Sequence, residues 1–406
     1  MSKFSIHKLK FLIIILFTIL SLIISPATNF FTSVLGDTYL PHELHSQLTG
    51  AAALTDTTPY DVYGTDLGII LKHNGQYHYI FGDTFSSGTT NWRSNTIAYS
   101  TDADPSDGIS LNGWILDPIA AKAKELISSL KEDNVEKTCI PTTALSYNDI
   151  IYIYFMSVNH WGVIGGEWQC NNASIAISTD NGQNFSKMTN VSWSGLSNFV
   201  QFGFVQNQAS VLSDGYSYFL ATPSGRYGAC YLCRVPQDSL LNQTAYEYYT
   251  GTGFFGYPQW SSDHTEVEEI FPASVGELSV MWNEFLQKWT VFYFDNTNLN
   301  IVLRTADNLW GPWSSIYAIA GAGEYPSLYG SYVHPDFVEN SGEEVYFIMS
   351  KFNVYNTFVL SVNLNSLLPT TNPTLQSGLP ALVVIAILLV TYSLSYINKK
   401  LRNHKF

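Results

Sequence analysis

Hydrophobic and polar positions alternate along most of the chain between residues 65 and 363, and the pattern repeats five times. In each repeat, a run rich in aromatic and β-branched residues follows a turn, which predicts a β-strand. A second strand-like run precedes it, and a third follows it. The predicted first strands are 65–73, 139–147, 203–212, 276–284 and 330–339; the second are 76–85, 150–158, 216–223, 288–296 and 344–352; the third are 95–102, 173–180, 228–235, 300–307 and 356–363.

Radial repetition of short antiparallel sheets is how a β-propeller protects its strand edges. We therefore predict an all-β fold, a five-bladed β-propeller, in which residues before Thr65 supply the outer strand of the last blade. The alternative, a pair of β-sandwiches, does not account for five matched triplets. Residues 178–185 resemble the Asp-box of sialidase-type propellers, which is a structural hairpin turn and not a catalytic element.

One segment departs from the strand pattern. Asp117 and Pro118 are typical of a helix start, and apolar residues then recur at helical spacing up to Leu130. We expect a small helical insertion packed on the side of the β domain.

The two ends of the chain carry the longest apolar stretches. Residues 1–27 combine three lysines, a short apolar run and a small-residue site, as in a secretory signal peptide; cleavage is favoured over a signal anchor because the run is short. Residues 379–397 carry no charge and precede a basic tail at 398–406, which favours a transmembrane helix over a buried core helix. With a stalk at 364–378, the sequence predicts a single-pass type I protein of the plasma membrane with residues 28–363 outside the cell.

Composition excludes some classes of function. The net charge is −14, and only 13% of the 406 residues are charged. Because seven basic residues lie at the two ends, the predicted exported region carries a charge of about −21. A nucleic-acid partner is therefore not expected, and 46% apolar residues argue against a disordered chain.

Modification sites are expected on an exported chain. Four N-x-S/T sequons predict N-glycosylation at Asn172, Asn184, Asn190 and Asn242. Among the four cysteines, Cys139 and Cys170 are the favoured disulfide. Cys230 and Cys233 stand three apart in a strand-like run, so we expect them on opposite faces. No second pair or histidine cluster supports a zinc or redox motif.

Two aspartates stand out in the first repeat. Asp66 interrupts the apolar run TDLGII on the first predicted strand, and Asp83 ends the second in a Gly-Asp-Thr sequence. On adjacent antiparallel strands, these carboxylates can face one another near the axis. Glycoside hydrolysis needs such a pair, one as the acid and one as the base or nucleophile. The alternative is that both aspartates only cap turns.

The chain also resembles a known family. The blocks 64–102, 140–168, 222–235, 276–283, 304–313, 329–337 and 350–356 resemble, in order, the domain-of-unknown-function family 4185. The resemblance implies a five-bladed propeller and, for some members, an endo-D-arabinofuranase that cleaves mycobacterial arabinan. It places the catalytic carboxylates on Asp66 and Asp83. Thr143-Ala144 stands where the family often has glycines.

Other candidates rank behind this pair. Glu277 is either a third catalytic carboxylate or a charge at a strand start. The candidate substrate-binding residues are Arg93, Asn95, His160, Trp161, Arg226, Tyr329 and His334, with structural roles as their alternatives. No cofactor or metal is expected.

The leading hypothesis is thus a cell-surface glycoside hydrolase acting on furanosidic, arabinan-like linkages of a polysaccharide or glycan, with the lipid bilayer as a second partner. The alternative is a non-catalytic carbohydrate-binding or envelope-associated propeller.

Overall fold

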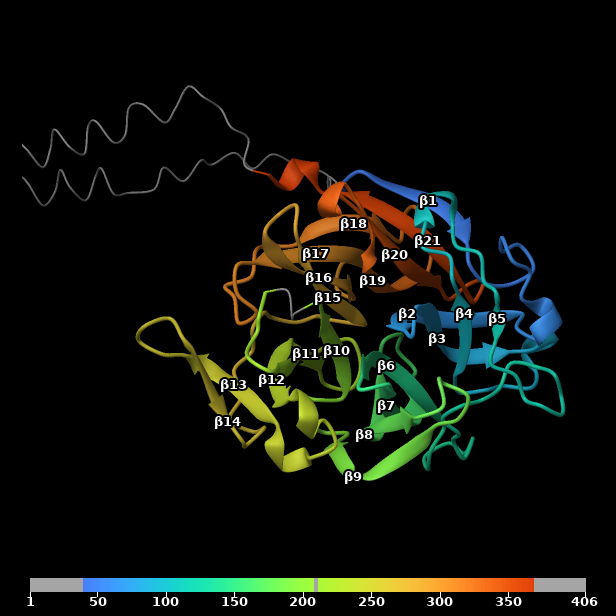
Figure 1. Cartoon of the computed structure of the whole chain (residues 1–406), viewed down its shortest axis with the longest axis horizontal. Helices are drawn as coiled ribbons and strands as arrows, with labels where there is room; N and C mark the ends of the chain where they lie inside the picture. Colours follow the sequence, from blue (N-terminus) through green and yellow to red (C-terminus); the bar gives the residue numbers. More distant parts are fainter. Residues whose placement is uncertain (1–38, 208–210, 369–406) are drawn as a thin grey trace, which may run out of the picture. The chain divides into compact units, whose positions relative to one another are not determined.

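The computed structural model describes residues 39–207 and 211–368, which form 21 β-strands and only short 3₁₀ helices (Figure 1). The first sheet contains β2 (Gly64–His73), β3 (Gln76–Phe85), β4 (Thr96–Ser100) and β5 (Gly113–Trp114). The next contains β6 (Thr138–Tyr147), β7 (Ile150–Trp161), β8 (Trp168–Ser178) and β9 (Ser186–Ser194). The 3₁₀ helices are Thr58–Tyr60, Ser87–Thr89, Pro105–Asp107, Gln237–Ser239, Gln243–Ala245, Asn340–Gly342 and Asn365–Leu367.

The remaining strands form two further sheets. A nine-stranded sheet combines β10 (Gln201–Gln206), β11 (Tyr216–Thr222), β12 (Tyr231–Pro236), β13 (Glu247–Thr252) and β14 (Pro258–Ser261) with β15 (Leu278–Asn283), β16 (Lys288–Asp295), β17 (Asn300–Ala306) and β18 (Tyr317–Gly321). The last sheet contains β1 (His42–Gln47), β19 (Leu328–Glu339), β20 (Glu344–Lys351) and β21 (Asn356–Asn363). All three strands of every predicted triplet are present.

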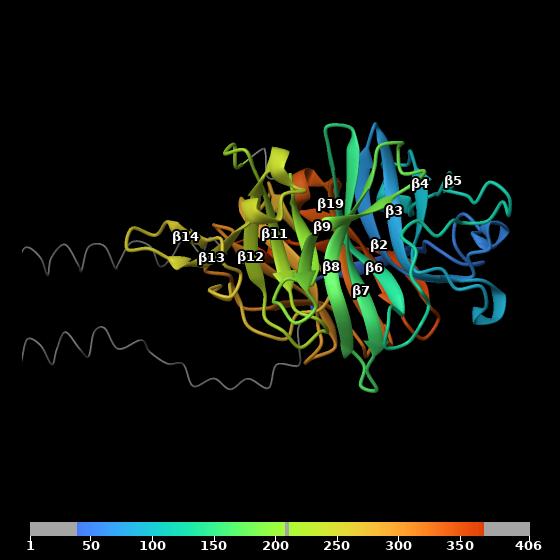
Figure 2. The ribbon, with the colours of Figure 1, turned by 90° about the horizontal axis from the view of Figure 1, so that it is seen from below.

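The first strand of each triplet lies on the inside. β2, β6, β10, β15 and β19 contact one another in sequence order, and β19 returns to contact β2 (Figure 1). Figure 2 shows β6, β7 and β8 side by side, seen from below. β10 and β15 also form a short parallel pairing, which joins two antiparallel sets into the nine-stranded sheet. The fold is therefore all-β and propeller-like. The count of five blades depends on dividing that sheet between β10 and β15.

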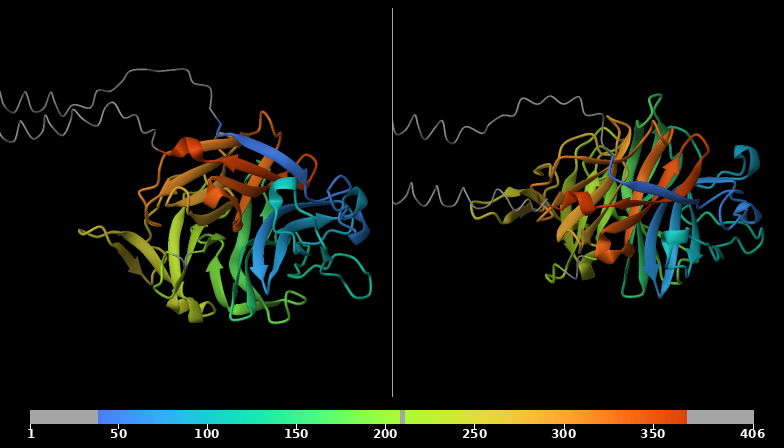
Figure 3. Two further views of the ribbon diagram at one scale, coloured as in Figure 1. Left: turned by 45° about the horizontal axis from the view of Figure 1, so that its top comes forward. Right: turned by 90° about the horizontal axis from the view of Figure 1, so that it is seen from above.

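Residues before Thr65 supply an outer strand, as predicted. β1 pairs antiparallel with β21, with His42 opposite Val362 (Figure 3). The first and last described strands thus share one sheet, so this sheet is built from both ends of the domain.

The Asp-box prediction is also confirmed as a turn between β8 and β9. The Ser178 hydroxyl donates to Asp180 Oδ1 at 2.7 Å, and the Gly182 N–H donates to the Ser178 hydroxyl at 2.9 Å. The Asn184 N–H reaches Asp180 Oδ1 at 2.9 Å. These contacts close the turn on itself, in agreement with a structural role.

The predicted helical insertion is wrong. Residues 117–137 form turns and isolated bridges, beginning where Asp117 Oδ1 accepts the N–H groups of Ile119 and Ala120. Only the middle of the apolar stripe is buried: Ala123, Leu126 and Ile127 lie in the core, whereas Ile119 is 95% exposed and Leu130 is 65% exposed. The segment is instead held by contacts with the 93–95 region, described below.

The predicted Cys139–Cys170 disulfide is also wrong. All four cysteines are free and buried. Cys139 lies on β6 and Cys170 on β8, with β7 between them, which separates the Cα atoms by about 9–10 Å. A disulfide requires about 4.4–6.8 Å. Cys230 and Cys233 contribute to different core clusters, which confirms that they face opposite sides of their sheet.

Several predictions concern residues outside the described part of the chain. The signal peptide (1–27), the transmembrane stretch (379–397), the tail (398–406) and most of the stalk (364–378) lie there. Among residues 39–207 and 211–368, no helix is long and apolar enough to cross a membrane. Glycosylation stays a prediction; Asn184, Asn190 and Asn242 are exposed, and Asn172 is partly buried.

Candidate active site

Asp66 and Asp83 come together at a break in the register of the β2–β3 hairpin. One residue of β2, Asp66, stands opposite two residues of β3, Gly82 and Asp83. The next two residues of β2 have left-handed backbones, with φ of 68° at Leu67 and 98° at Gly68. A β-bulge of this kind redirects side chains and is common beside active sites. The strained backbone at Leu67 costs about 1–2 kcal/mol, which the surrounding contacts must offset.

Glycine at position 82 makes room for the Asp66 carboxylate. A Cβ atom added to Gly82 would lie 2.3 Å from Asp66 Oδ1. The other oxygen, Oδ2, accepts hydrogen bonds from the hydroxyls of Tyr329 at 2.8 Å and Tyr355 at 3.2 Å. Oδ1 is buried and has no hydrogen-bond partner among the described residues. Asp66 thus keeps one oxygen without a protein partner, pressed against the strand that carries Asp83.

Asp83 lies in a different environment. Its Oδ1 accepts hydrogen bonds from the Trp92 indole N–H at 2.7 Å and from the Thr138 hydroxyl at 2.6 Å. The side chain is buried, with 7% of its surface exposed. The Lys131 ammonium lies 4.5 Å from the centre of the Trp92 ring. Two donors and a nearby cation therefore support the ionised form of Asp83.

Glu277 lies immediately before β15 and is paired with Arg226. The guanidinium donates from Nε to both carboxylate oxygens at 3.1 and 3.0 Å, and from Nη2 to Oε1 at 2.6 Å. Arg226 also lies over the rings of Tyr329 at 4.8 Å, Phe294 at 5.2 Å and Trp168 at 5.5 Å. The Tyr329 hydroxyl in turn donates to Asp66, so the Arg226–Glu277 ion pair is linked to Asp66 through the Tyr329 side chain.

Burial raises the pKa of both aspartates. The pKa of Asp66 rises to about 7, first through burial and then through the negative charges of Asp83 and Glu277, with the tyrosine hydroxyls partly opposing the rise. The pKa of Asp83 rises to about 6 through burial, opposed by its two hydrogen bonds and by Lys131. Of the two carboxylates, Asp66 therefore holds its proton to the higher pH.

Arg93 does not point into this cluster. Its guanidinium donates to the carbonyl oxygens of Asp61 at 2.6 Å and Ala123 at 3.1 Å. The side chain is 7% exposed. Arg93 therefore joins two loops beside the first sheet, which is the structural alternative considered from the sequence.

Asn95 has a similar role. Its amide nitrogen donates to the carbonyl oxygens of Ile127 at 2.7 Å and Cys139 at 2.9 Å, and its oxygen accepts the N–H groups of Leu126 and Ile127. The side chain is 1% exposed. With these four hydrogen bonds, Asn95 fixes the 126–127 segment against β6.

The two histidines lie apart from the aspartates. His160 contacts Asp133, with Nδ1 3.1 Å from Oδ2. His334 accepts the Asp336 N–H at 3.1 Å and packs on the Tyr77 ring. It stands five residues beyond Tyr329 on β19, roughly 15 Å along a strand. Burial lowers the pKa of His334 to about 4, so its ring is neutral at physiological pH.

Trp161 borders the cluster without touching the aspartates. Its ring packs edge-on against Trp168 at 5.6 Å, and Trp168 in turn lies against Arg226. Of the candidate residues, the structure therefore brings together Asp66, Asp83, Glu277, Arg226 and Tyr329, with Trp161 in a second layer.

Sequence reasoning missed several residues that contact the aspartates. Trp92 and Tyr355 lie within the family-like blocks 64–102 and 350–356, so the blocks held a signal that strand patterns alone do not provide. Thr138 immediately precedes the predicted strand 139–147. Lys131 comes directly after the segment predicted as a helix, and nothing in the pattern indicated that its charge acts on Asp83.

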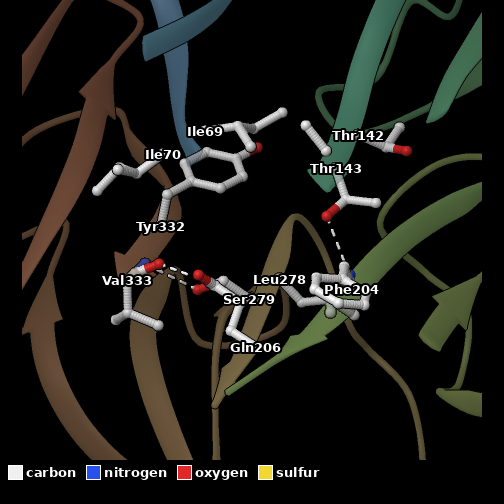
Figure 4. A pocket seen from close by; sticks show the side chains of 11 residues that line it. Ile69, Ile70, Thr142, Thr143, Phe204, Gln206, Leu278, Ser279, Tyr332 and Val333 are labelled. Carbon is white, nitrogen blue, oxygen red and sulfur yellow. Dashed lines mark hydrogen bonds between the residues drawn. The ribbon is translucent and has the colours of Figure 1, made fainter. Parts of the chain in front are cut away.

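A small cavity lies along the inner strands, and neither aspartate is among the residues that line it (Figure 4). It has room for about one water molecule. Its lining comes from all five inner strands: Ile69, Ile70, Thr142, Thr143, Ala144, Phe204, Gln206, Leu278, Ser279, Tyr332 and Val333. The inner strands therefore pack closely at the centre of the fold, and the space left between them is too small for a sugar ring. In the part of the chain that the structure describes, no three His, Cys, Asp or Glu side chains gather as metal ligands.

Solved structures with a similar fold include glycoside hydrolases. A candidate hydrolase from Bacteroides ovatus ATCC 8483 has a TM-score of 0.53 at 13% identity, covering 74% of this chain and 86% of that chain. The exo-β-1,3-galactanase of Phanerochaete chrysosporium, solved with β-1,3-galactotriose, has a TM-score of 0.50 at 10% identity, covering 80% of this chain and 65% of that chain. At these identities, the likeness shows the fold alone.

Relatives in sequence come from fungi. The Notoamide biosynthesis cluster protein J' of Aspergillus versicolor is 29% identical over 298 residues, covering 68% of this chain and 77% of the relative. The Notoamide biosynthesis cluster protein J of Aspergillus sp. (strain MF297-2) is 25% identical over 318 residues, covering 72% of this chain and 80% of the relative. Residues 52–361 match the domain of unknown function DUF4185, and the chain therefore belongs to this family.

Proposed function

We propose that the protein is a glycoside hydrolase in which Asp66 is the general acid and Asp83 is the base or nucleophile. The observation that carries the proposal is the β-bulge, which places Asp66 opposite Gly82 and Asp83, with Asp66 Oδ1 and the Asp83 side chain buried. Hydrolysis of a glycosidic bond needs one proton donor at the leaving oxygen and one carboxylate at the anomeric carbon or its attacking water.

The different surroundings of the two aspartates support this division of roles. Asp83 receives an N–H and an O–H hydrogen bond and lies near the Lys131 cation, all of which favour its ionised form. Asp66 is buried near two other carboxylates, which favours its protonated form. With the higher pKa, Asp66 is the group that holds a proton for the leaving oxygen at neutral pH.

Glu277 has a supporting role in this proposal. Both of its oxygens accept hydrogen bonds from Arg226, which favours a fixed carboxylate over a proton donor. Its negative charge raises the pKa of Asp66, and its partner Arg226 orients the Tyr329 ring that donates to Asp66. We assign Glu277 and Arg226 to positioning.

The fold shared with the exo-β-1,3-galactanase supports a glycan substrate. The furanosidic, arabinan-like linkage rests on the family resemblance of the blocks around Asp66 and Asp83. We also propose that the domain acts at the cell surface, held by residues 379–397. Protease treatment of intact cells tests this, since a surface domain is shed and an internal one is protected.

The decisive experiment is hydrolysis of a panel of arabinans, other furanosides and galactans by the purified protein. Activity should fall by at least about 10³-fold in Asp66→Asn and in Asp83→Asn, and Asp263→Asn, an exposed carboxylate, serves as control. NMR of the product anomers shows whether hydrolysis retains or inverts the configuration at the anomeric carbon. Unchanged activity in either of the two site variants would refute the assignment, and glycan binding without cleavage would favour a binding propeller.

A further inference from the structure

The segment between β5 and β6 brings a lysine to the active site. Lys131 adopts a left-handed backbone with φ of 61°, a conformation that costs a residue with a side chain about 1 kcal/mol or more. Such strain is found at functional positions when surrounding contacts maintain it. The contacts here all involve the ammonium group.

Three neighbours fix that ammonium. Lys131 Nζ lies 4.5 Å from the centre of the Trp92 ring, donates to the Ser94 hydroxyl at 2.5 Å, and forms an ion pair with Glu125. Glu125 is itself held by the Ser94 N–H at 2.7 Å. The lysine is therefore clamped over the indole face rather than extended into solvent.

The same indole donates to Asp83. Trp92 Nε1 lies 2.7 Å from Asp83 Oδ1, so the ring is held between a cation on one face and a carboxylate at its edge. A cation over an indole stabilises the ring's position by about 0.5–2 kcal/mol. Without Lys131, the ring would keep its stacking on Phe85, with 6.3 Å between ring centroids, but would lose the cation that helps to hold it against Asp83.

Lys131 also differs in charge from its surroundings. Several elements bring groups to face Asp83. The strands contribute Asp66 from β2 and Thr138 from β6, and the β20–β21 turn contributes Tyr355. The other groups are Trp92, and Glu125 and Lys131 from the segment before β6. Among these described groups, Lys131 is the one cation. It therefore opposes the combined effect of burial and of the neighbouring carboxylates.

We propose that Lys131 is a positioning residue for hydrolysis: it clamps the Trp92 indole against Asp83 and presents a positive charge to that carboxylate. The inference rests on the proposed function, in which Asp83 must be ionised to act. It also gives the segment 117–137 a role in the active site.

The test uses the full chain with ¹³C-carboxyl-labelled aspartate, and assigns the Asp83 resonance by its loss in Asp83→Asn. Lys131→Met keeps roughly the length of the side chain and removes its charge, so the midpoint of the Asp83 titration should rise by roughly one pH unit. Lys131→Arg should restore it. The control is Lys124→Met, because Lys124 contacts Gln183 and Asn184 instead.

A second variant covers the case in which Lys131→Met fails to fold. Trp92→Phe keeps a ring beneath Lys131 and removes the N–H donor, so it should also raise the Asp83 titration. An Asp83 titration unchanged in the folded variants, or a shift of equal size in Lys124→Met, would overturn the proposal.

Hydrolysis provides an independent readout. If a substrate is cleaved, the acidic limb of the kcat/KM profile should move up in Lys131→Met by the same interval as the titration. If Asp83→Asn leaves hydrolysis intact, the proposed function fails, while the titration still decides whether Lys131 acts on Asp83.

Discussion

Replacing Gly82 by alanine tests whether the β-bulge builds the active site. Gly82 has no unusual backbone angle that alanine would strain, so the change acts through its added methyl group alone. That methyl would lie 2.3 Å from Asp66 Oδ1 and 3.1 Å from Leu67 Cδ1. The carboxylate must move, because nothing else at this distance can give way.

The size of the effect follows from these contacts. An ordinary carbon–oxygen contact begins near 3.4 Å, so Asp66 Oδ1 must retreat by about 1 Å. The movement disturbs the hydrogen bonds at 2.8 and 3.2 Å from Tyr329 and Tyr355. A displacement of about 1 Å in a reacting group reduces activity by about 10²-fold, whereas overpacking lowers the free energy of unfolding by about 1–3 kcal/mol.

The assay compares kcat on the cleaved glycan with the denaturant midpoint for Gly82→Ala and for Gly323→Ala. A Cβ on Gly323 meets no atom within 4 Å, so this control should leave both quantities unchanged. Full activity in a stably folded Gly82→Ala protein would show that the Asp66 position is not critical, and the bulge argument would fail.

Three further predictions concern stability. The pKa of Asp66 is about 7 in the folded state and near 4 in the unfolded state, so the folded state binds the extra proton and the free energy of unfolding falls as the pH rises from 4 to 7. Asp66→Asn should remove about 2–4 kcal/mol of this fall, as measured by denaturation at several pH values. Glu277→Gln should lower stability by about 3 kcal/mol by leaving Arg226 buried without its ion pair, and adding Arg226→Met should recover part of the loss in the same measurement. Asn95→Ala should lower the free energy of unfolding by about 2–4 kcal/mol, because the buried backbone groups that form its four hydrogen bonds lose their partner. A thermal midpoint equal to that of the wild type would contradict this prediction.

The strand order could be predicted because each blade is a local unit. A triplet such as 65–73, 76–85 and 95–102 pairs with itself, so its alternation is set by neighbours close in sequence. The pair Asp66 and Asp83 followed from the same locality, since a hairpin brings positions 17 apart together. Here sequence reasoning and structure agree.

Contacts between segments could not be predicted in this way. The apolar spacing at 117–130 suggested a helix, but Asn95 and Ser94 take up its backbone and side-chain groups, and a helix would forfeit these contacts. Similarly, the Cys139–Cys170 prediction relied on an even cysteine count, which contains no information on the strand that lies between them. Lys131 reaches Trp92 only because that segment folds back on the first sheet.

The pairing of β1 with β21 bears on how the molecule is made. His42 and Val362 pair across 320 positions of sequence, so this ladder has the longest loop-closure cost in the domain. On the ribosome, β1 emerges first and must wait for β21 before its edge is covered. Until then the last sheet lacks its outer strand, and β1 has an unpaired edge open to other chains. We therefore expect closure to be a late step in folding, after the first hairpin has brought the two aspartates together.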